Sequence, residues 1–262
     1  RRILMLGDSF LENLEVDFHD VYHKILEQRL CQETGSDIEV VAIGSQGYST
    51  AQELLAFRRY REVVAPDVVI TIFYTGNDFE DNARKQFAYL NDDRKLCFSE
   101  NRPSTWNVQK QTFKRWLYES SHLVFLLKNR IESWGGLTIE DPAKAIANDG
   151  EGYREQMTRQ LLAAMRDEVQ SSGVRFGVVV MPSRDELLAG DRRLIELAIS
   201  YCREWGITHV DLSQGLRSED YFEHDVHLTR DGHVKVAQLL RAFLLAEFPR
   251  ELGTSSETSA AE

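Results

Sequence analysis

The chain has 262 residues, of which 42% are hydrophobic and 28% are charged, a composition typical of a soluble globular protein. This length fits one α/β domain that carries an insertion. The formal net charge of −11 argues against nucleic-acid binding, because a phosphate backbone is held by clustered Lys and Arg. The spacing of the cysteines matches neither a metal site nor a disulfide framework, so we expect free thiols at Cys31, Cys97 and Cys202, with one disulfide as the alternative in an exported protein.

The first half of the chain alternates short apolar runs with segments of helical spacing. A continuous apolar run predicts a strand that is buried on both faces over residues 3–6, and two further β-rich runs predict strands over residues 38–43 and 68–74. Apolar residues at helical spacing predict helices over residues 16–30 and 50–64. Thr50 is the predicted N-cap of the second helix.

The alternation stops over residues 80–150, where we expect an inserted segment without strands and with one helix at 111–132. The aromatic residues of this insertion fit either a lid over a substrate or a small separate core. The alternation then resumes, with predicted strands over residues 176–181 and 208–212 and predicted helices over 153–170, 185–205 and 231–248.

Strands that alternate with helices predict a parallel sheet with helices on both faces. We expect a single domain over residues 1–250, with the inserted helical segment at 80–150. The last residues, 251–262, are rich in Ser, Thr, Ala and Glu, and we expect them to form a disordered tail.

Four short polar segments come directly after predicted strands or just before the last predicted helix. They are residues 7–10 (GDSF), 44–50 (GSQGYST), 76–78 (GND) and 225–227 (DVH). Ligand sites of parallel sheets lie at the carboxyl ends of the strands. We therefore expect these segments to form one site.

Together the segments supply the groups of an acyl-transfer site. The Ser9 hydroxyl is a weak nucleophile that needs an adjacent base, and His227 accepts a proton near neutral pH. Asp225 is the nearest carboxylate to orient the imidazole. The backbone N–H groups of Ser9 and Gly47 and the Asn77 amide are candidate donors to the oxyanion of the tetrahedral intermediate.

In this order, the four segments resemble the four blocks of the SGNH/GDSL hydrolases, and the resemblance extends over residues 4–237. The stretch GYSTAQEL is similar to bacterial members. The resemblance implies a flavodoxin-like, three-layer α/β/α fold with five parallel strands. It also implies Ser9 as nucleophile, His227 as base, and Gly47 and Asn77 in the oxyanion hole. The chemistry requires neither a metal nor an organic cofactor.

Two positions depart from the family pattern. The family usually has Asp three residues before the histidine, where this chain has His224. Asp225 is two residues before the histidine, a spacing that resembles the alginate O-acetyltransferase branch. The orienting group is therefore Asp225, a backbone carbonyl in a Ser–His dyad, or Asp211 as a second choice. Ala42 replaces the Asn that is frequent in the second block.

Some neighbouring residues permit other interpretations. The histidines and acids of residues 223–227, together with His233, suggest a metal-dependent hydrolase, but their spacing matches no helix-borne zinc motif. We expect a structural role for His233. Arg184, after the fourth predicted strand, fits either a contact with a substrate anion or a surface salt bridge. Asp78 is expected to brace the turn that carries Asn77.

The expected function is that of a serine esterase that works through an acyl-serine intermediate. A small acyl group, such as acetyl on a carbohydrate, is the expected substrate. The alternatives are an O-acyltransferase acting on a polysaccharide and a non-catalytic carbohydrate-binding protein of the same fold. We expect no stable protein partner. Arg1 and Arg2 directly precede the first predicted strand. Together with the low cysteine content and the acidic charge balance, this start predicts a bacterial extracytoplasmic domain whose native N-terminus has been removed, with a cytoplasmic enzyme as the alternative.

Overall fold

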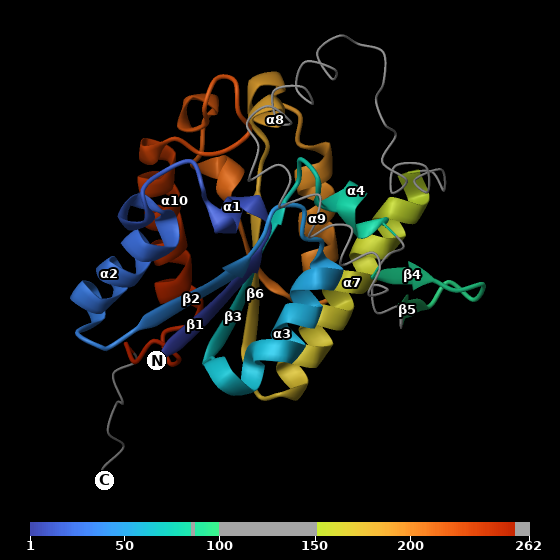
Figure 1. The fold of residues 1–262 in the computed structure, drawn as a ribbon, viewed down its shortest axis with the longest axis horizontal. Helices are drawn as coiled ribbons and strands as arrows, with labels where there is room; N and C mark the ends of the chain where they lie inside the picture. Colours follow the sequence, from blue (N-terminus) through green and yellow to red (C-terminus); the bar gives the residue numbers. More distant parts are fainter. Residues whose placement is uncertain (85–86, 100–150, 255–262) are drawn as a thin grey trace, which may run out of the picture.

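The computed structural model describes residues 1–84, 87–99 and 151–254. Its centre is a parallel sheet of five strands in the order β2-β1-β3-β6-β7 (Figure 1). The strands are β1 (Arg2–Gly7), β2 (Glu39–Gly44), β3 (Val68–Tyr74), β6 (Arg175–Met181) and β7 (Thr208–Asp211). Every residue of the central strand β3 is buried, which explains its largely apolar sequence. The predicted five-stranded parallel sheet is confirmed.

Helices cover both faces of this sheet and give the predicted α/β/α layers. Along β1, Ile3 and Met5 pack into one core and Leu4 and Leu6 into the other, because successive side chains of a strand point to opposite faces. The first core is covered by α1 (Ser9–Glu12), α2 (Tyr22–Thr34) and α10 (Arg230–Glu247). The second is covered by α3 (Thr50–Val64), α7 (Glu151–Ser171) and α9 (Arg193–Glu204).

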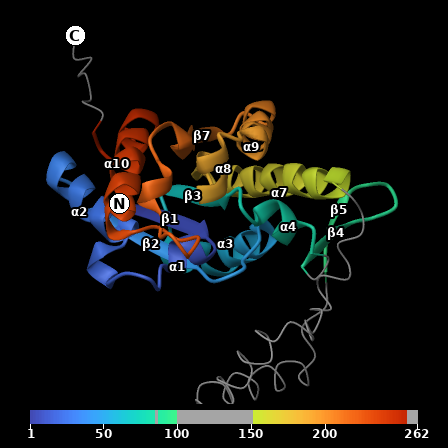
Figure 2. The same cartoon turned by 90° about the horizontal axis from the view of Figure 1, so that it is seen from above.

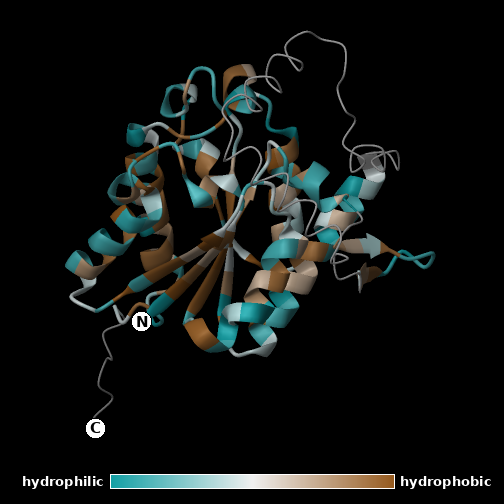
Figure 3. Ribbon diagram, viewed as in Figure 1, coloured by the Kyte–Doolittle hydropathy of each residue, from teal (hydrophilic) through white to brown (hydrophobic). Residues whose placement is uncertain are grey.

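The apolar residues concentrate in the strands and on the helix surfaces that face them, while the outer helix surfaces are largely hydrophilic (Figure 3). Among the described helices, none has both the length and the apolar character needed to cross a bilayer. All three cysteines are free, as predicted. Burial raises the pKa of the Cys202 thiol to about 12.

The strand order reverses between β1 and β3. From β1 the chain crosses to β2 on one side, and β3 then pairs with β1 on the other side. Such a reversal opens a crevice outside the carboxyl ends of the two strands, where α/β proteins bind ligands. Ser9 follows β1 and Asn77 follows β3, so both lie at this reversal.

Three predicted helices differ from the observed ones. The helix over 50–64 has Ser49 at its N-cap position, and the predicted cap Thr50 is its first residue. The predicted helix over 16–30 begins later, at Tyr22, after a short 3-10 turn at Phe18–Asp20. The predicted helix over 185–205 is divided into α8 (Arg184–Ala189) and α9. The division occurs because Gly190 has a φ of 65°, a left-handed conformation that ends α8.

The insertion contains an antiparallel hairpin of β4 (Ala88–Leu90) and β5 (Leu96–Phe98). The prediction that residues 80–150 contain no strand was therefore wrong, because strands of three residues are too short to show periodicity. The hairpin lies beside α7, on the side away from α2 and α10 (Figures 1 and 2). Ala88 shares a small core there with Met157 and Leu161 of α7. The predicted helix at 111–132 and most of the predicted tail lie outside the described residues.

Candidate active site

The first predicted segment places Ser9 at the start of α1, directly after β1. The helix is capped by Asp8, whose carboxylate accepts a hydrogen bond of 2.9 Å from the Phe10 N–H. Ser9 is therefore the first residue of the helix and not its cap, which leaves its hydroxyl available for other contacts. Gly44, at the end of β2, approaches this turn so closely that an added Cβ would lie 2.8 Å from the Gly7 carbonyl oxygen.

His227 reaches Ser9 from the loop that precedes α10. Its Nε2 lies 2.9 Å from the Ser9 Oγ, although the two residues are 218 positions apart in the sequence. Asp225 Oδ1 lies 2.5 Å from His227 Nδ1 and also accepts the His227 backbone N–H at 2.9 Å. These hydrogen bonds from His227 lower the pKa of Asp225 below its ordinary value. The structure thus places the His227 imidazole between the Ser9 hydroxyl and the Asp225 carboxylate, as predicted.

A second carboxylate reaches the same nitrogen of His227. Glu15 Oε1 lies 3.3 Å from His227 Nδ1, and the Glu15 side chain is 23% exposed, compared with 51% for Asp225. Glu15 follows α1, whose C-cap residue Asn13 has a left-handed conformation. Sequence reasoning missed Glu15 because it belongs to none of the four segments, and its contact with His227 depends on how two distant loops pack.

Two of the candidate oxyanion donors are free in the described structure. Among the described residues, none accepts a hydrogen bond from the N–H groups of Ser9 and Gly47. Gly47 has a φ of 72°, a conformation that L side chains rarely adopt. A Cβ at this position would meet no atom closer than 3.9 Å, so the backbone conformation, and not space, favours glycine.

Asn77 is held between two carboxylates. Its Nδ2 donates to Asp8 Oδ2 and to Asp81 Oδ2, each at 3.1 Å. An amide nitrogen has only two hydrogens, so donation to an oxyanion requires the release of one of these bonds. The bond to Asp8 places Asn77 beside the turn that carries Ser9. As predicted, Asp78 braces the adjacent turn, because its Oδ2 accepts the Tyr74 N–H at 2.8 Å.

Buried carboxyl groups lie behind the candidate site. Burial raises the pKa of Asp8, and burial raises the pKa of Glu53 well above the ordinary value of 4.5. The negative charge of Asp8 raises the pKa of Glu53 further, while the Thr71 hydroxyl lowers it. The folded protein therefore holds a proton on Glu53 at pH values where the unfolded chain has lost it.

This difference predicts a pH dependence of stability. A folded-state pKa above the unfolded one means that stability is lost as the pH rises from about 4.5 toward the raised value. Glu53→Gln removes this titration, so its free energy of unfolding, measured by urea denaturation, should fall less steeply with pH than that of wild type. Glu62→Gln, on the exposed side of the same helix, is the control and should keep the wild-type slope. Equal slopes for wild type and Glu53→Gln would contradict the raised pKa of Glu53.

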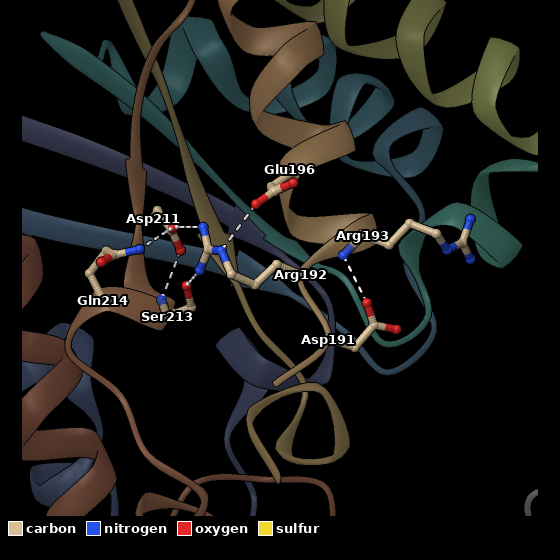
Figure 4. A network of polar contacts seen from close by, with 7 residues as sticks. All are labelled: Asp191, Arg192, Arg193, Glu196, Asp211, Ser213 and Gln214. Carbon is tan, nitrogen blue, oxygen red and sulfur yellow. Dashed lines mark hydrogen bonds and ion pairs between the residues drawn. The ribbon is translucent and has the colours of Figure 1, made fainter. Parts of the chain in front are cut away.

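Asp211 does not contact His227. Its carboxylate accepts hydrogen bonds from Arg192 at 2.8 Å, from the Ser213 N–H at 2.9 Å and from Gln214 at 3.1 Å (Figure 4). These partners occupy the carboxylate at the end of the edge strand β7. The second-choice prediction of Asp211 as the orienting acid was therefore wrong.

The histidines near the site do not converge. Among the described residues, no group of three or more His, Cys, Asp and Glu side chains is arranged to hold a metal ion. His224 is exposed. His233 is buried, accepts the Tyr22 N–H on its Nδ1 at 3.3 Å and stacks on the Tyr22 ring. Burial lowers the pKa of His233 to about 4. Its structural role is as predicted.

Comparison with known proteins gives a family and a set of similar folds. Residues 5–235 match the model of the GDSL-like lipase/acylhydrolase family. No curated protein matches the chain. The structure of TesA is similar, with a TM-score of 0.56 and 14% identity over 93% of this chain and 98% of that chain. The lipase/acylhydrolase from Enterococcus faecalis has a TM-score of 0.55 and 14% identity, over 94% of this chain and 96% of that chain. At these identities, the similarity shows the fold.

Proposed function

Since the chain belongs to the GDSL-like lipase/acylhydrolase family, whose activity is ester hydrolysis, we propose that it forms an acyl-serine intermediate on Ser9, with His227 as the base. The observation that carries this proposal is the 2.9 Å contact between His227 Nε2 and Ser9 Oγ, with a carboxylate on the other imidazole nitrogen. A non-catalytic binding protein of the same fold has no need for this linked arrangement.

The reaction takes two steps. His227 Nε2 removes the proton of Ser9 Oγ as this oxygen attacks the ester carbonyl carbon. The imidazolium then gives the proton to the oxygen of the departing alcohol, which leaves an acyl-Ser9 ester. In the second step His227 activates a water molecule in the same way. Water attacks the acyl carbon, the Ser9 oxygen recovers its proton, and a carboxylic acid is released.

The free N–H groups of Ser9 and Gly47 stabilise the negative charge on the carbonyl oxygen in both steps. Gly47→Ala should move the backbone N–H of residue 47, because alanine disfavours the φ of 72°. Losing one such donor lowers kcat by about 10²-fold or more, measured with p-nitrophenyl acetate. The matched control is Gly35→Ala, since Gly35 has a φ of 64° at the end of α2. Equal rates for the two variants would remove Gly47 from the oxyanion hole.

Asp225 and Glu15 share the orienting role in this proposal. Asp225→Asn and Glu15→Gln should each lower kcat by about tenfold, because the other carboxylate still accepts the Nδ1 proton of His227. In the double variant, kcat should fall by about 10³-fold or more. This is close to the effect of removing the orienting acid from a site that has only one such acid. Asp17→Asn, an exposed acid in the same loop, is the control. A double variant that keeps wild-type kcat would instead favour the Ser–His dyad.

An acetyl ester of a carbohydrate is the substrate that we propose. The supporting observation is a cavity of about 250 Å³ beside Asp225, whose lining includes the charged side chains of Arg184 and Glu223. Hydrolysis of p-nitrophenyl acetate, butyrate and octanoate should decline with chain length. Faster hydrolysis of the octanoate would contradict a small acyl group. An O-acyltransferase uses the same acyl-Ser9 intermediate, and transfer of the acetyl group to an added sugar in place of water would identify it.

A further inference from the structure

Asp81 lies on α4 (Asp78–Asn82), the short helix that directly follows Asn77. Its side chain is only 3% exposed, and its two oxygen atoms have different partners. Oδ2 accepts the Asn77 amide at 3.1 Å, and Oδ1 forms an ion pair with Arg84 Nη2 at 2.7 Å. One buried carboxylate therefore links the candidate oxyanion donor Asn77 to a cation.

The two carboxylates beside Asn77 determine how its amide is oriented. An ionised carboxylate only accepts hydrogen bonds, so the amide nitrogen, and not the carbonyl oxygen, must face Asp8 and Asp81. The Asn77 Oδ1 is buried and has no hydrogen-bond partner among the described residues. Both hydrogens of the Asn77 nitrogen therefore have fixed positions before any substrate binds.

Of these two bonds, the bond to Asp8 lies on the side of the turn that carries Ser9. Asp8 directly precedes Ser9 in the chain, and its Oδ1 already accepts the Phe10 N–H at 2.9 Å. Asp8 therefore keeps a hydrogen bond when Asn77 releases it. An oxyanion that forms at Ser9 can take the place of Asp8 as the acceptor, so that one negatively charged acceptor substitutes for another.

Arg84 favours the ionised form of Asp81. Burial raises the pKa of Asp81 to about 6, and the positive charge of Arg84 opposes this rise. The negative charges of Asp8 and Glu80 raise the pKa further. Without Arg84, Asp81 would hold a proton more readily. It would then bind the Asn77 amide less strongly, because hydrogen bonds to ionised acceptors are the stronger ones.

Arg84 also lies beside the loop of a second candidate donor. A Cβ built on Gly47 would be 3.9 Å from Arg84 Nη1. A buried hydrogen bond of 2.9 Å, from the Thr50 N–H to Asn82 Oδ1, joins the start of α3 to the end of α4. The loop of Gly47 and the turn of Asn77 precede these two helices, so the bond fastens the two donor segments to each other.

We propose that Asp81 and Arg84 are positioning residues for the oxyanion hole. They hold one hydrogen of the Asn77 amide in place, so that the other hydrogen leaves Asp8 and donates to the oxyanion formed at Ser9. This inference rests on the proposed function, because the oxyanion exists only during acyl transfer at Ser9. It adds to that function a device that presents the third donor, and it assigns Arg84 no contact with the substrate.

The kinetic test is a double-mutant cycle with p-nitrophenyl acetate. Asn77→Ala should lower kcat by about 10²-fold or more, as expected for the loss of one oxyanion donor. Arg84→Gln should lower kcat by about tenfold with KM unchanged, because the positioned amide acts only in the transition state. In the Asn77→Ala background, Arg84→Gln should have no further effect, since the amide that it positions is absent. Arg84→Lys keeps the positive charge and should retain most of the wild-type kcat.

Arg154→Gln is the matched control for Arg84→Gln. Arg154 Nη1 lies 2.9 Å from Glu80 Oε1, so this substitution removes a surface ion pair of the same helix α4. It should keep the wild-type kcat. An equal loss of kcat from Arg84→Gln with and without the Asn77 amide would overturn the proposal. A raised KM with unchanged kcat would also overturn it, because it would show a contact between Arg84 and the substrate.

A spectroscopic measurement separates this proposal from the proposed function. In proton–nitrogen correlation spectra, the side-chain amide signals that Asn77→Ala removes belong to Asn77. Without any substrate, Arg84→Gln should shift these signals and Arg154→Gln should not. A phosphonate attached to Ser9 carries an oxygen at the oxyanion position, and in wild type it should shift mainly one of the two hydrogen signals.

The outcomes differ for the two proposals. If wild type hydrolyses the ester but Arg84→Gln leaves the Asn77 signals in place, the positioning role of Arg84 fails and the esterase mechanism stands. If wild type neither hydrolyses an ester nor takes up the phosphonate, while Arg84→Gln still shifts the Asn77 signals, then the link from Arg84 to Asn77 stands and the proposed function fails.

Discussion

Ser9→Ala is expected to lower kcat for p-nitrophenyl acetate by at least about 10³-fold, because the variant lacks the hydroxyl that forms the acyl intermediate. Ser9 is the first residue of α1, and Asp8 provides the cap, so the loss of the hydroxyl should leave the helix intact. The melting temperature should therefore stay close to that of wild type. Ser200→Ala, an exposed serine on α9, is the control for kcat.

A second readout tests the covalent step directly. A phosphonate ester should add one phosphonyl group to the wild-type protein, seen as a mass increase of the intact chain, and Ser9→Ala should remain unlabelled. Labelling of the alanine variant would place the nucleophile elsewhere. Such a result would remove the proposed acyl-serine intermediate at Ser9 but would leave family membership unaffected.

His227→Ala is expected to have an effect of similar size, about 10³-fold or more in kcat, because the Ser9 hydroxyl then has no base. The two residues act as one unit, so the double variant Ser9→Ala/His227→Ala should be no slower than the slower single variant. Added imidazole should restore part of the rate of His227→Ala and none of the rate of Ser9→Ala.

The exposed His19 provides the control for His227, and His19→Ala should keep the wild-type rate. His227→Ala that retains more than a tenth of the wild-type kcat would mean that another group takes the Ser9 proton. If the loss of kcat in the double variant equalled the product of the losses in the two single variants, this would likewise contradict a single catalytic unit.

The sheet and the location of the site were predictable from local sequence patterns. Buried strands appear as continuous apolar runs, and helices as apolar residues at helical spacing, so the runs at 3–6 and 68–74 indicated the parallel strands. The same patterns placed Ser9 and Asn77 after strands, where parallel sheets bind ligands. The Asp225–His227 contact was also within reach of sequence reasoning, because a single residue separates the partners.

Contacts between distant loops were decided only by the tertiary structure. Glu15 meets His227, and Asn77 binds Asp8, because packing of the sheet and helices brings separate loops together. No local pattern encodes such pairs. The Asp211 prediction was wrong for the same reason, since a carboxylate beside a strand end gave no sign that Arg192 would bind it. The amino-acid sequence by itself determined the elements and the carboxyl-edge position of the site, because local spacing sets both. The tertiary structure decided which charged groups face one another there.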